Sequence, residues 1–335
     1  MARSGPNANV PLIRLSAFNP FLQELVSRKL DPGKLLVEQG LPPTIPASSE
    51  LFVSALSMYT LVEQAAAFAG DPYLGATVGG KLDPLAWEPI AAAAESAGTV
   101  GELLGRFVVN ATDHSSGTVF SVETTGDRAI FGFRRVIEPP FAPAQNDAFY
   151  TGFMVNIMKS ATGEHWQADR VLVQVSDPAA IPPDYNDLHI ARGDYRGFRM
   201  HFPADWLFEK FEHPTFAFRI NKAVEAHPPG SLIESVRQAI LPHIHEEGLT
   251  VDRAAQLCGA GKRQLSRKLK DKGTTLAREI AALRRERAAQ ALVTTNDRVA
   301  DIAGRVGFID PTVFSRAFKN WTGQSPQHFR RDHRH

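Results

Sequence analysis

The last third of the chain has apolar residues at helical spacing almost throughout. A short helix begins at Thr250, a favourable N-cap residue, and ends at Gly259. A second short helix follows, in which Leu265 and Leu269 lie four residues apart and face inward. Polar and basic residues therefore cover its outer face. Two short helices joined by a tight turn that contains glycine are typical of a helix-turn-helix motif.

The same pattern occurs a second time further along the chain. The sequence predicts a short helix over Val299–Val306, a glycine turn, and a next helix that Asp310 caps and a proline begins. This helix buries Phe314 and Phe318 and exposes polar residues. Between the two units, Leu276–Val293 has the apolar stripe of one long helix. A duplicated motif is far more specific than a single one, which chance produces often.

The first two thirds of the chain mix helical and strand-like patterns. The predicted helices are Phe18–Lys29, Leu51–Ala69, Pro89–Ala97, Val100–Asn110 and Gln145–Lys159. The predicted strands are Gly117–Thr124, Arg128–Val136, Arg170–Val175 and Gly197–Phe202, and a Thr-Gly-Asp hairpin turn joins the first two. This pattern indicates an α+β domain.

The domain boundary falls where two prolines and a glycine interrupt the chain, in Ala226-His-Pro-Pro-Gly230. Ser231 can cap the helix that follows. We therefore predict an α+β domain over residues 1–226. An all-α domain with two helix-turn-helix motifs joined by a long helix follows it, over residues 227–335.

The charge of the whole chain conceals a strong asymmetry. Its 335 residues carry 37 Lys and Arg against 36 Asp and Glu, a net charge of +1. Residues 231–335 carry 19 basic and 11 acidic residues, a net of +8, and residues 1–230 carry 18 and 25, a net of −7. A basic domain joined to an acidic one points to nucleic acid or an anionic surface as partner of the basic part.

Other features exclude several classes of protein. One cysteine, Cys258, rules out a disulfide framework and a cysteine-based zinc cluster. No signal peptide or membrane-spanning run is visible, so we expect a cytoplasmic protein with no membrane partner. We find no phosphate-binding loop, no nucleophile elbow and no metal-binding spacing. His243 and His245 lack a third ligand, so we expect both to be surface histidines. The sequence therefore predicts no enzyme, no metal site and no cofactor.

The second helix-turn-helix unit carries a recognisable signature. It reads Ile302-Ala-Gly-Arg-Val-Gly307-Phe308-Ile-Asp-Pro-Thr-Val-Phe314-Ser315-Arg316-Ala317-Phe318-Lys319-Asn-Trp-Thr-Gly323-Gln-Ser325-Pro326-Gln-His-Phe329-Arg330. This segment resembles the DNA-binding domain of the AraC/XylS family of transcription regulators nearly position by position. The first two thirds resemble the subgroup with an arabinose-binding-like N-terminal domain, which senses a small effector or mediates dimerisation.

The resemblance implies which residues contact DNA. The family's base-reading positions fall on Arg263, Ser266 and Arg267 in the first recognition helix, and on Thr312, Ser315 and Arg316, with Lys319 on the same exposed face, in the second. Gly261 stands where the family has an N-cap serine. The resemblance further implies double-stranded DNA as partner, a homodimer, a small-molecule effector and, in an activator, contact with RNA polymerase. Because most members are activators, we expect an activator.

Three arginines cluster inside the acidic domain, at Arg192, Arg196 and Arg199. The spacing of the first two resembles the Arg-x-x-x-Arg motif with which PilZ domains hold cyclic di-GMP. Asp113-His-Ser115-Ser-Gly117 is one residue short of the second PilZ element. Guanidinium groups clamp phosphate and stack on guanine. The sequence therefore suggests an anionic effector, with cyclic di-GMP as leading candidate.

Two further arginines, Arg134 and Arg135, on the exposed end of a strand, are candidates to join this site. The competing interpretation is that the clustered arginines are surface residues paired with Asp187 and Asp194. Two other functions stay open at this point: a ligand-independent regulator whose N-terminal domain only dimerises, and an enzyme domain fused to a DNA-binding domain.

Overall fold

The computed structural model describes residues 9–45, 50–211 and 228–333. The described residues form two compact units. One, here called the N-terminal unit, consists mainly of residues from Pro11 to Phe211, and the other, the C-terminal unit, mainly of residues from Pro229 onward. The predicted boundary between residues 226 and 227 lies outside the described residues.

The N-terminal unit contains a five-stranded sheet of order β3-β4-β7-β5-β6. Its strands are β3 (Thr118–Thr125), β4 (Arg128–Arg135), β5 (Leu172–Val175), β6 (His189–Arg192) and β7 (Gly197–Pro203). All neighbours are antiparallel except β5 and β6, which are parallel. A separate antiparallel pair is formed by β1 (Leu12–Arg14) and β2 (Phe52–Ser54).

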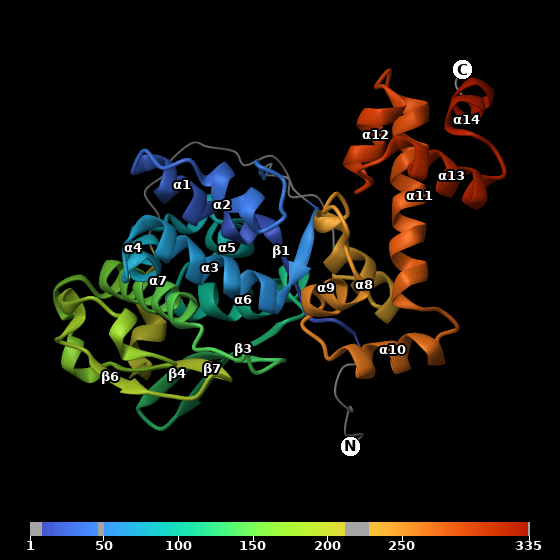
Figure 1. The fold of residues 1–335 in the computed structure, drawn as a ribbon. Coiled ribbons are helices and arrows are strands. Elements are labelled where there is room, and N and C mark those ends of the chain that lie inside the picture. Colours follow the sequence, from blue (N-terminus) through green and yellow to red (C-terminus); the bar gives the residue numbers. More distant parts are fainter. Residues whose placement is uncertain (1–8, 46–49, 212–227, 334–335) are drawn as a thin grey trace. The chain divides into compact units, whose positions relative to one another are not determined.

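The helices of the N-terminal unit lie on one side of the five-stranded sheet (Figure 1). They are α1 (Asn19–Ser27), α2 (Pro32–Glu38), α3 (Ala55–Ala69), α4 (Leu74–Lys81), α5 (Glu88–Ala94), α6 (Val100–His114) and α7 (Ala144–Thr162). Along β4 and β7, Phe131, Phe133 and Phe198 are buried on the covered face. Arg134 and Arg199 are exposed on the opposite face, as the two-residue repeat of a strand requires. The predicted α+β class is confirmed.

Several predicted elements need correction. The helix predicted over Leu51–Ala69 begins only at Ala55, because Phe52–Ser54 is strand β2 and the Ser54 hydroxyl caps the helix by accepting from Ser57 N–H at 3.1 Å. Short strands β1, β2 and β6, and helices α2 and α4, were not predicted. Three- and four-residue strands carry too little alternation to detect, and α4 is rich in glycine, which disfavours helix.

Helix α4 lies directly against α7, with glycines at the contact. A Cβ atom at Gly75 or Gly79 of α4 would overlap the backbone oxygen of Gln145 or Phe149, respectively. From the α7 side, a Cβ atom at Gly152 would overlap the backbone oxygen of Ala76. The glycines that make α4 hard to predict are therefore the residues that let the two helix backbones approach this closely.

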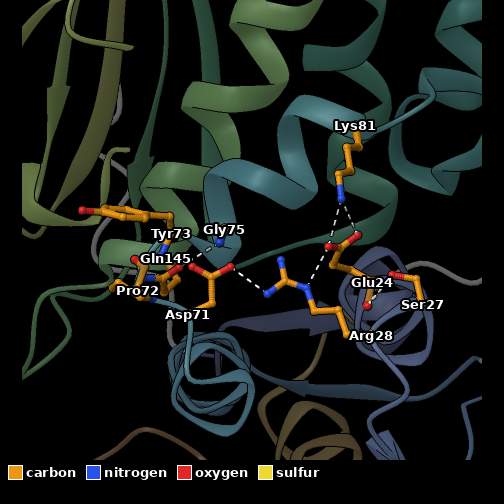
Figure 2. A network of polar contacts seen from close by, with 9 residues as sticks. All are labelled: Glu24, Ser27, Arg28, Asp71, Pro72, Tyr73, Gly75, Lys81 and Gln145. Carbon is orange, nitrogen blue, oxygen red and sulfur yellow. Dashed lines mark hydrogen bonds and ion pairs between the residues drawn. The ribbon is translucent and has the colours of Figure 1, made fainter. Parts of the chain in front are cut away.

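A polar network holds α4 against its neighbours (Figure 2). The Arg28 guanidinium bridges Glu24 at 2.9 Å and Asp71 at 2.7 Å, and Lys81 Nζ lies 3.0 Å from Glu24. Burial works to raise the pKa of Glu24, but hydrogen bonds from Arg28 and Lys81 outweigh it and lower that pKa. The Gln145 side chain accepts from Gly75 N–H at 2.8 Å and donates to the carbonyl oxygen of Pro72 at 2.7 Å. The network thus connects α1, α4, α7 and the turn between α3 and α4.

The C-terminal unit is all helical in its described part. Its helices are α8 (Leu232–Ile240), α9 (Val251–Leu257), α10 (Lys262–Asp271), α11 (Leu276–Thr294), α12 (Val299–Arg305), α13 (Pro311–Thr322) and α14 (Pro326–His333). Helices α9 and α10 form the first helix-turn-helix motif, α12 and α13 form the second, and α11 joins them (Figure 1). Phe314 and Phe318 are completely buried beside Ala288 and Leu292 of α11. The predicted all-α arrangement is confirmed.

Candidate nucleic-acid interface and ligand groove

The first recognition helix, α10, is anchored by two leucines. Leu265 and Leu269 are buried, which leaves Arg263, Ser266 and Arg267 exposed on the opposite face. Neither arginine forms an ion pair within the described part of the chain. Gly261 stands at the N-cap and provides no side-chain cap, as its identity requires. The predicted contact residues therefore share one free, positively charged surface.

The second recognition helix, α13, likewise has one buried apolar face and one exposed polar face. Asp310 caps it by accepting from Thr312 N–H at 2.6 Å, and this hydrogen bond lowers the pKa of the Asp310 carboxyl. Thr312, Arg316 and Lys319 are exposed. Ser315 differs, because it is only partly exposed and its hydroxyl donates to the carbonyl oxygen of Pro311 at 2.8 Å. Its oxygen keeps acceptor capacity toward a base or phosphate-bound water.

The arginines of α11 have unequal surroundings. Arg284 is half-buried, its guanidinium lies 5.2 Å from the ring centroid of Phe308, and burial lowers its pKa. It therefore packs inside the C-terminal unit, at the turn of the second helix-turn-helix motif. Arg285 and Arg287 are exposed.

The exposed face of the five-stranded sheet carries a groove lined by three of the predicted arginines. Arg134, Arg196 and Arg199 lie in its wall, with Gln174 and Asp194 as further polar groups. The groove has a volume of about 350 Å³. Arg134 and Arg199 have no ion-pair partner among the described residues, whereas Arg196 Nε contacts Glu138 Oε2 at 2.8 Å. Two guanidinium groups without an ion-pair partner among the described residues thus line the same groove.

Arg192 does not line this groove. Its guanidinium bonds to Asp177 at 2.8 Å and to the carbonyl oxygen of Ser176 at 3.2 Å. The suggested pairing with Asp187 is not formed, and Asp194 accepts from the backbone N–H of Arg196 at 2.9 Å rather than from a guanidinium. The segment 113–117 precedes β3, at the opposite edge of the sheet from β6 and Arg192. The structure therefore does not assemble the two PilZ-like elements into one site.

The prediction that Arg135 lies on an exposed strand end is wrong. Its side chain is completely buried and forms an ion pair with Asp147, whose other carboxylate oxygen accepts from Ser176 N–H at 2.8 Å. The guanidinium also donates to Asn146 at 3.0 Å and lies 5.2 Å from the ring centroid of Tyr59. Burial raises the pKa of Asp147, and the positive charge of Arg135 opposes that rise. Arg135 thus belongs to the interior, away from the groove.

A second cavity lies in the core of the N-terminal unit, between helices and sheet. It is lined mainly by aromatic side chains, among them Phe107, Phe120 and Tyr150, and has a volume of about 60 Å³. A dry apolar cavity that admits benzene has roughly 150 Å³. The volume of the core cavity is therefore smaller than that of the groove on the sheet.

Other residues singled out in the sequence have ordinary surroundings. Cys258 is buried, and burial raises the pKa of its thiol to about 12. His243, expected on the surface, is buried beside Glu246. Across residues 9–45, 50–211 and 228–333, no three His, Cys, Asp or Glu side chains are grouped to hold a metal ion. None of the helices in those ranges is long and apolar enough to span a bilayer.

Comparison with known proteins assigns both units. The family model of a helix-turn-helix domain matches residues 254–332, and that of the arabinose-binding domain of AraC transcription regulators matches residues 30–189. Together these ranges cover well over half of the chain. The first covers α10 and α13, and the second covers most of the N-terminal unit.

Individual relatives match less than a third of the chain. The transcriptional activator NphR of Rhodococcus sp is 32% identical over 98 residues, which are 29% of each chain. An ornithine utilization regulator of Pseudomonas aeruginosa is 36% identical over 80 residues, 24% of each chain. The matches thus span less than a third of these relatives. The crystal structure of the regulator CdpR from Pseudomonas aeruginosa aligns over 94% of this chain and 98% of its own, at 17% identity and a TM-score of 0.37.

The duplicated helix-turn-helix motif, the signature of its second unit and the two domain matches agree with one another. The chain belongs to the AraC family of DNA-binding transcription regulators and carries an arabinose-binding-like N-terminal domain.

Proposed function

We propose that this regulator reads a specific DNA site with α10 and α13 and that an anionic effector in the groove of the N-terminal unit controls its activity. The observation that carries the first part is the pair of recognition helices whose unpaired arginines face outward. Arginine donates in a fork to guanine O6 and N7, and serine and threonine serve bases or phosphates. Two such helices fit successive major grooves about 34–36 Å apart, so the site has two boxes.

Replacing Arg267 by alanine tests base reading. We expect the variant to lose about 1–3 kcal/mol of binding free energy on the specific site and to relax the preference at one box, because the bidentate contact to guanine is gone. The measurement is the Kd for a DNA site that the wild type has selected from random duplexes, and the Kd for random duplex DNA, both at one fixed salt concentration. Arg106→Ala, which removes an exposed arginine from α6, is the matched control and leaves both Kd values unchanged. An equal loss on both DNAs for Arg267→Ala would contradict base reading.

The effector site is inferred from charge and size. The groove volume of about 350 Å³ lies within the range of small-molecule sites, roughly 300–1,000 Å³. Planar guanidinium groups suit phosphates and can stack on a purine, so cyclic di-GMP is the first candidate. A ligand controls DNA binding only if it favours one arrangement of a dimer or of the two units over another. We propose that the bound arrangement is a homodimer that activates transcription through RNA polymerase.

Calorimetry with cyclic di-GMP tests the effector and locates its site. We expect heat with the wild type and none with Arg134→Ala/Arg199→Ala, because these two groove arginines have no other ion-pair partner in the described chain. Arg192→Ala separates the groove from the Arg-x-x-x-Arg motif, since Arg192 bonds elsewhere. Loss of the binding heat only with Arg192→Ala would refute the proposal that the effector binds in the groove. No heat with the wild type would exclude cyclic di-GMP, and unchanged DNA affinity in its presence would favour a ligand-independent regulator.

A further inference from the structure

Two large apolar side chains are exposed at the start of the second recognition helix. Ile309 is 77% exposed and Val313 is 51% exposed. Among the described residues of the C-terminal unit, these two large apolar side chains are the most exposed. Ile309 directly precedes the N-cap Asp310, and Val313 is the third residue of α13. The surface of a DNA-binding domain gains no stability in water from an exposed isoleucine and an exposed valine four residues apart.

The usual structural role of an apolar residue before the N-cap is not fulfilled here. Such a residue packs against the fourth helical residue as a hydrophobic staple. The fourth residue of α13 is Phe314, which is completely buried against Phe308 and Phe318. With three quarters of its surface in solvent, Ile309 does not act as that staple. Packing therefore does not explain either side chain.

The position of the pair indicates what covers it. Val313 lies three residues before Arg316 and next to Thr312, so the apolar pair shares the exposed N-terminal end of α13 with polar and cationic groups. The N-terminal residues of a recognition helix are those that meet base edges in the major groove. There, one base presents an apolar group, the C5-methyl of thymine. A second copy of this positively charged surface would be repelled, whereas DNA is attracted.

We propose that Ile309 and Val313 form an apolar contact with thymine C5-methyl groups in the box that α13 reads. This inference rests on the proposed role of α13 as a base-reading helix. It makes the two residues determinants of sequence specificity that donate no hydrogen bond, and it places A·T pairs beside the base contacted by Arg316. Burial of one methyl group changes affinity about fourfold.

The test replaces single thymines by deoxyuridine, which removes only the methyl group. A specific site is first selected from random duplexes with the full-length chain, and each thymine is then exchanged in turn. We expect one or two exchanges in the α13 box to weaken wild-type binding about threefold to fivefold each. Val313→Ser and Ile309→Ser are expected to bind the thymine site more weakly than the wild type and to show no further loss at the sensitive deoxyuridine. Val313→Thr, which keeps one methyl group and the shape, retains part of the effect.

The outcomes separate this inference from the proposed function. A chain that selects no sequence at all would refute specific DNA reading itself. A chain that selects a site but binds every deoxyuridine version of the α13 box as tightly as thymine would refute the methyl contact alone. If the serine variants lose the same factor relative to the wild type on the thymine and deoxyuridine duplexes, the two side chains do not act through the methyl groups, and the inference is refuted. Exchanges in the α10 box serve as the internal control, because both serine variants respond to them as the wild type does.

Discussion

Replacing Asp147 by alanine is expected to destabilise the N-terminal unit by about 3–5 kcal/mol. The variant leaves the Arg135 guanidinium completely buried without its counter-charge, between the rings of Tyr59 and Phe133. It also removes the acceptor of Ser176 N–H, so that a buried backbone donor loses its hydrogen bond. Because both partners are fully buried, solvent cannot compensate either loss.

Urea unfolding followed by tryptophan fluorescence measures this effect, since Trp87 and Trp206 are buried in the N-terminal unit. The double variant Arg135→Met/Asp147→Leu is the control, and we expect it to recover most of the lost stability because no unpaired charge remains. A loss below about 1 kcal/mol in Asp147→Ala, or a double variant as unstable as the single one, would contradict the role assigned to this ion pair.

Replacing Gly152 by alanine is expected to cost on the order of 2–4 kcal/mol. Its Cβ atom would overlap backbone atoms of Ala76 and Gly80, and backbone cannot turn aside as the end of a side chain can. Helices α4 and α7 must therefore separate, which opens space along their whole contact. The higher intrinsic helix propensity of alanine, about 1 kcal/mol, only partly offsets this cost.

The matched control is Gly105→Ala in α6. This glycine is also inside a helix, but it is exposed and no atom lies within 4 Å of the added Cβ. We expect a gain of about 0.5–1 kcal/mol there, from helix propensity alone. Thermal unfolding of the two variants is thus expected to shift in opposite directions. A Gly152→Ala variant as stable as the wild type would show that the helices are not held as closely as described.

Local patterns predicted the C-terminal unit well, because each helix-turn-helix motif is built from contacts between residues close in sequence. Leu265 with Leu269, and Phe314 with Phe318, indicated both the buried and the exposed face of each recognition helix. Helix α4 could not be predicted in this way, since its glycines argue against a helix until α7 is placed beside it.

The alternation of side chains along β4 already determines where Arg135 lies. Neighbouring residues of a strand point to opposite faces, so Arg134 and Arg135 cannot both be exposed. Arg135 shares its face with Phe131 and Phe133, which assigns it to the interior. The groove, by contrast, was beyond local reasoning, because it brings together Arg134 of β4, Gln174 of β5 and Arg199 of β7. Which strands are neighbours is decided by the whole sheet and not by any one segment.

The glycine contact between α4 and α7 has a consequence for the sliding of one helix along the other. A surface without side chains offers few ridges and grooves that would fix the axial position of α4. The carboxamide of Gln145 fulfils this task, since it binds both Gly75 N–H and the Pro72 carbonyl oxygen at the start of the helix. Hydrogen–deuterium exchange at the Gly75 amide therefore reports the attachment of α4 to α7 and not the folding of α4 itself.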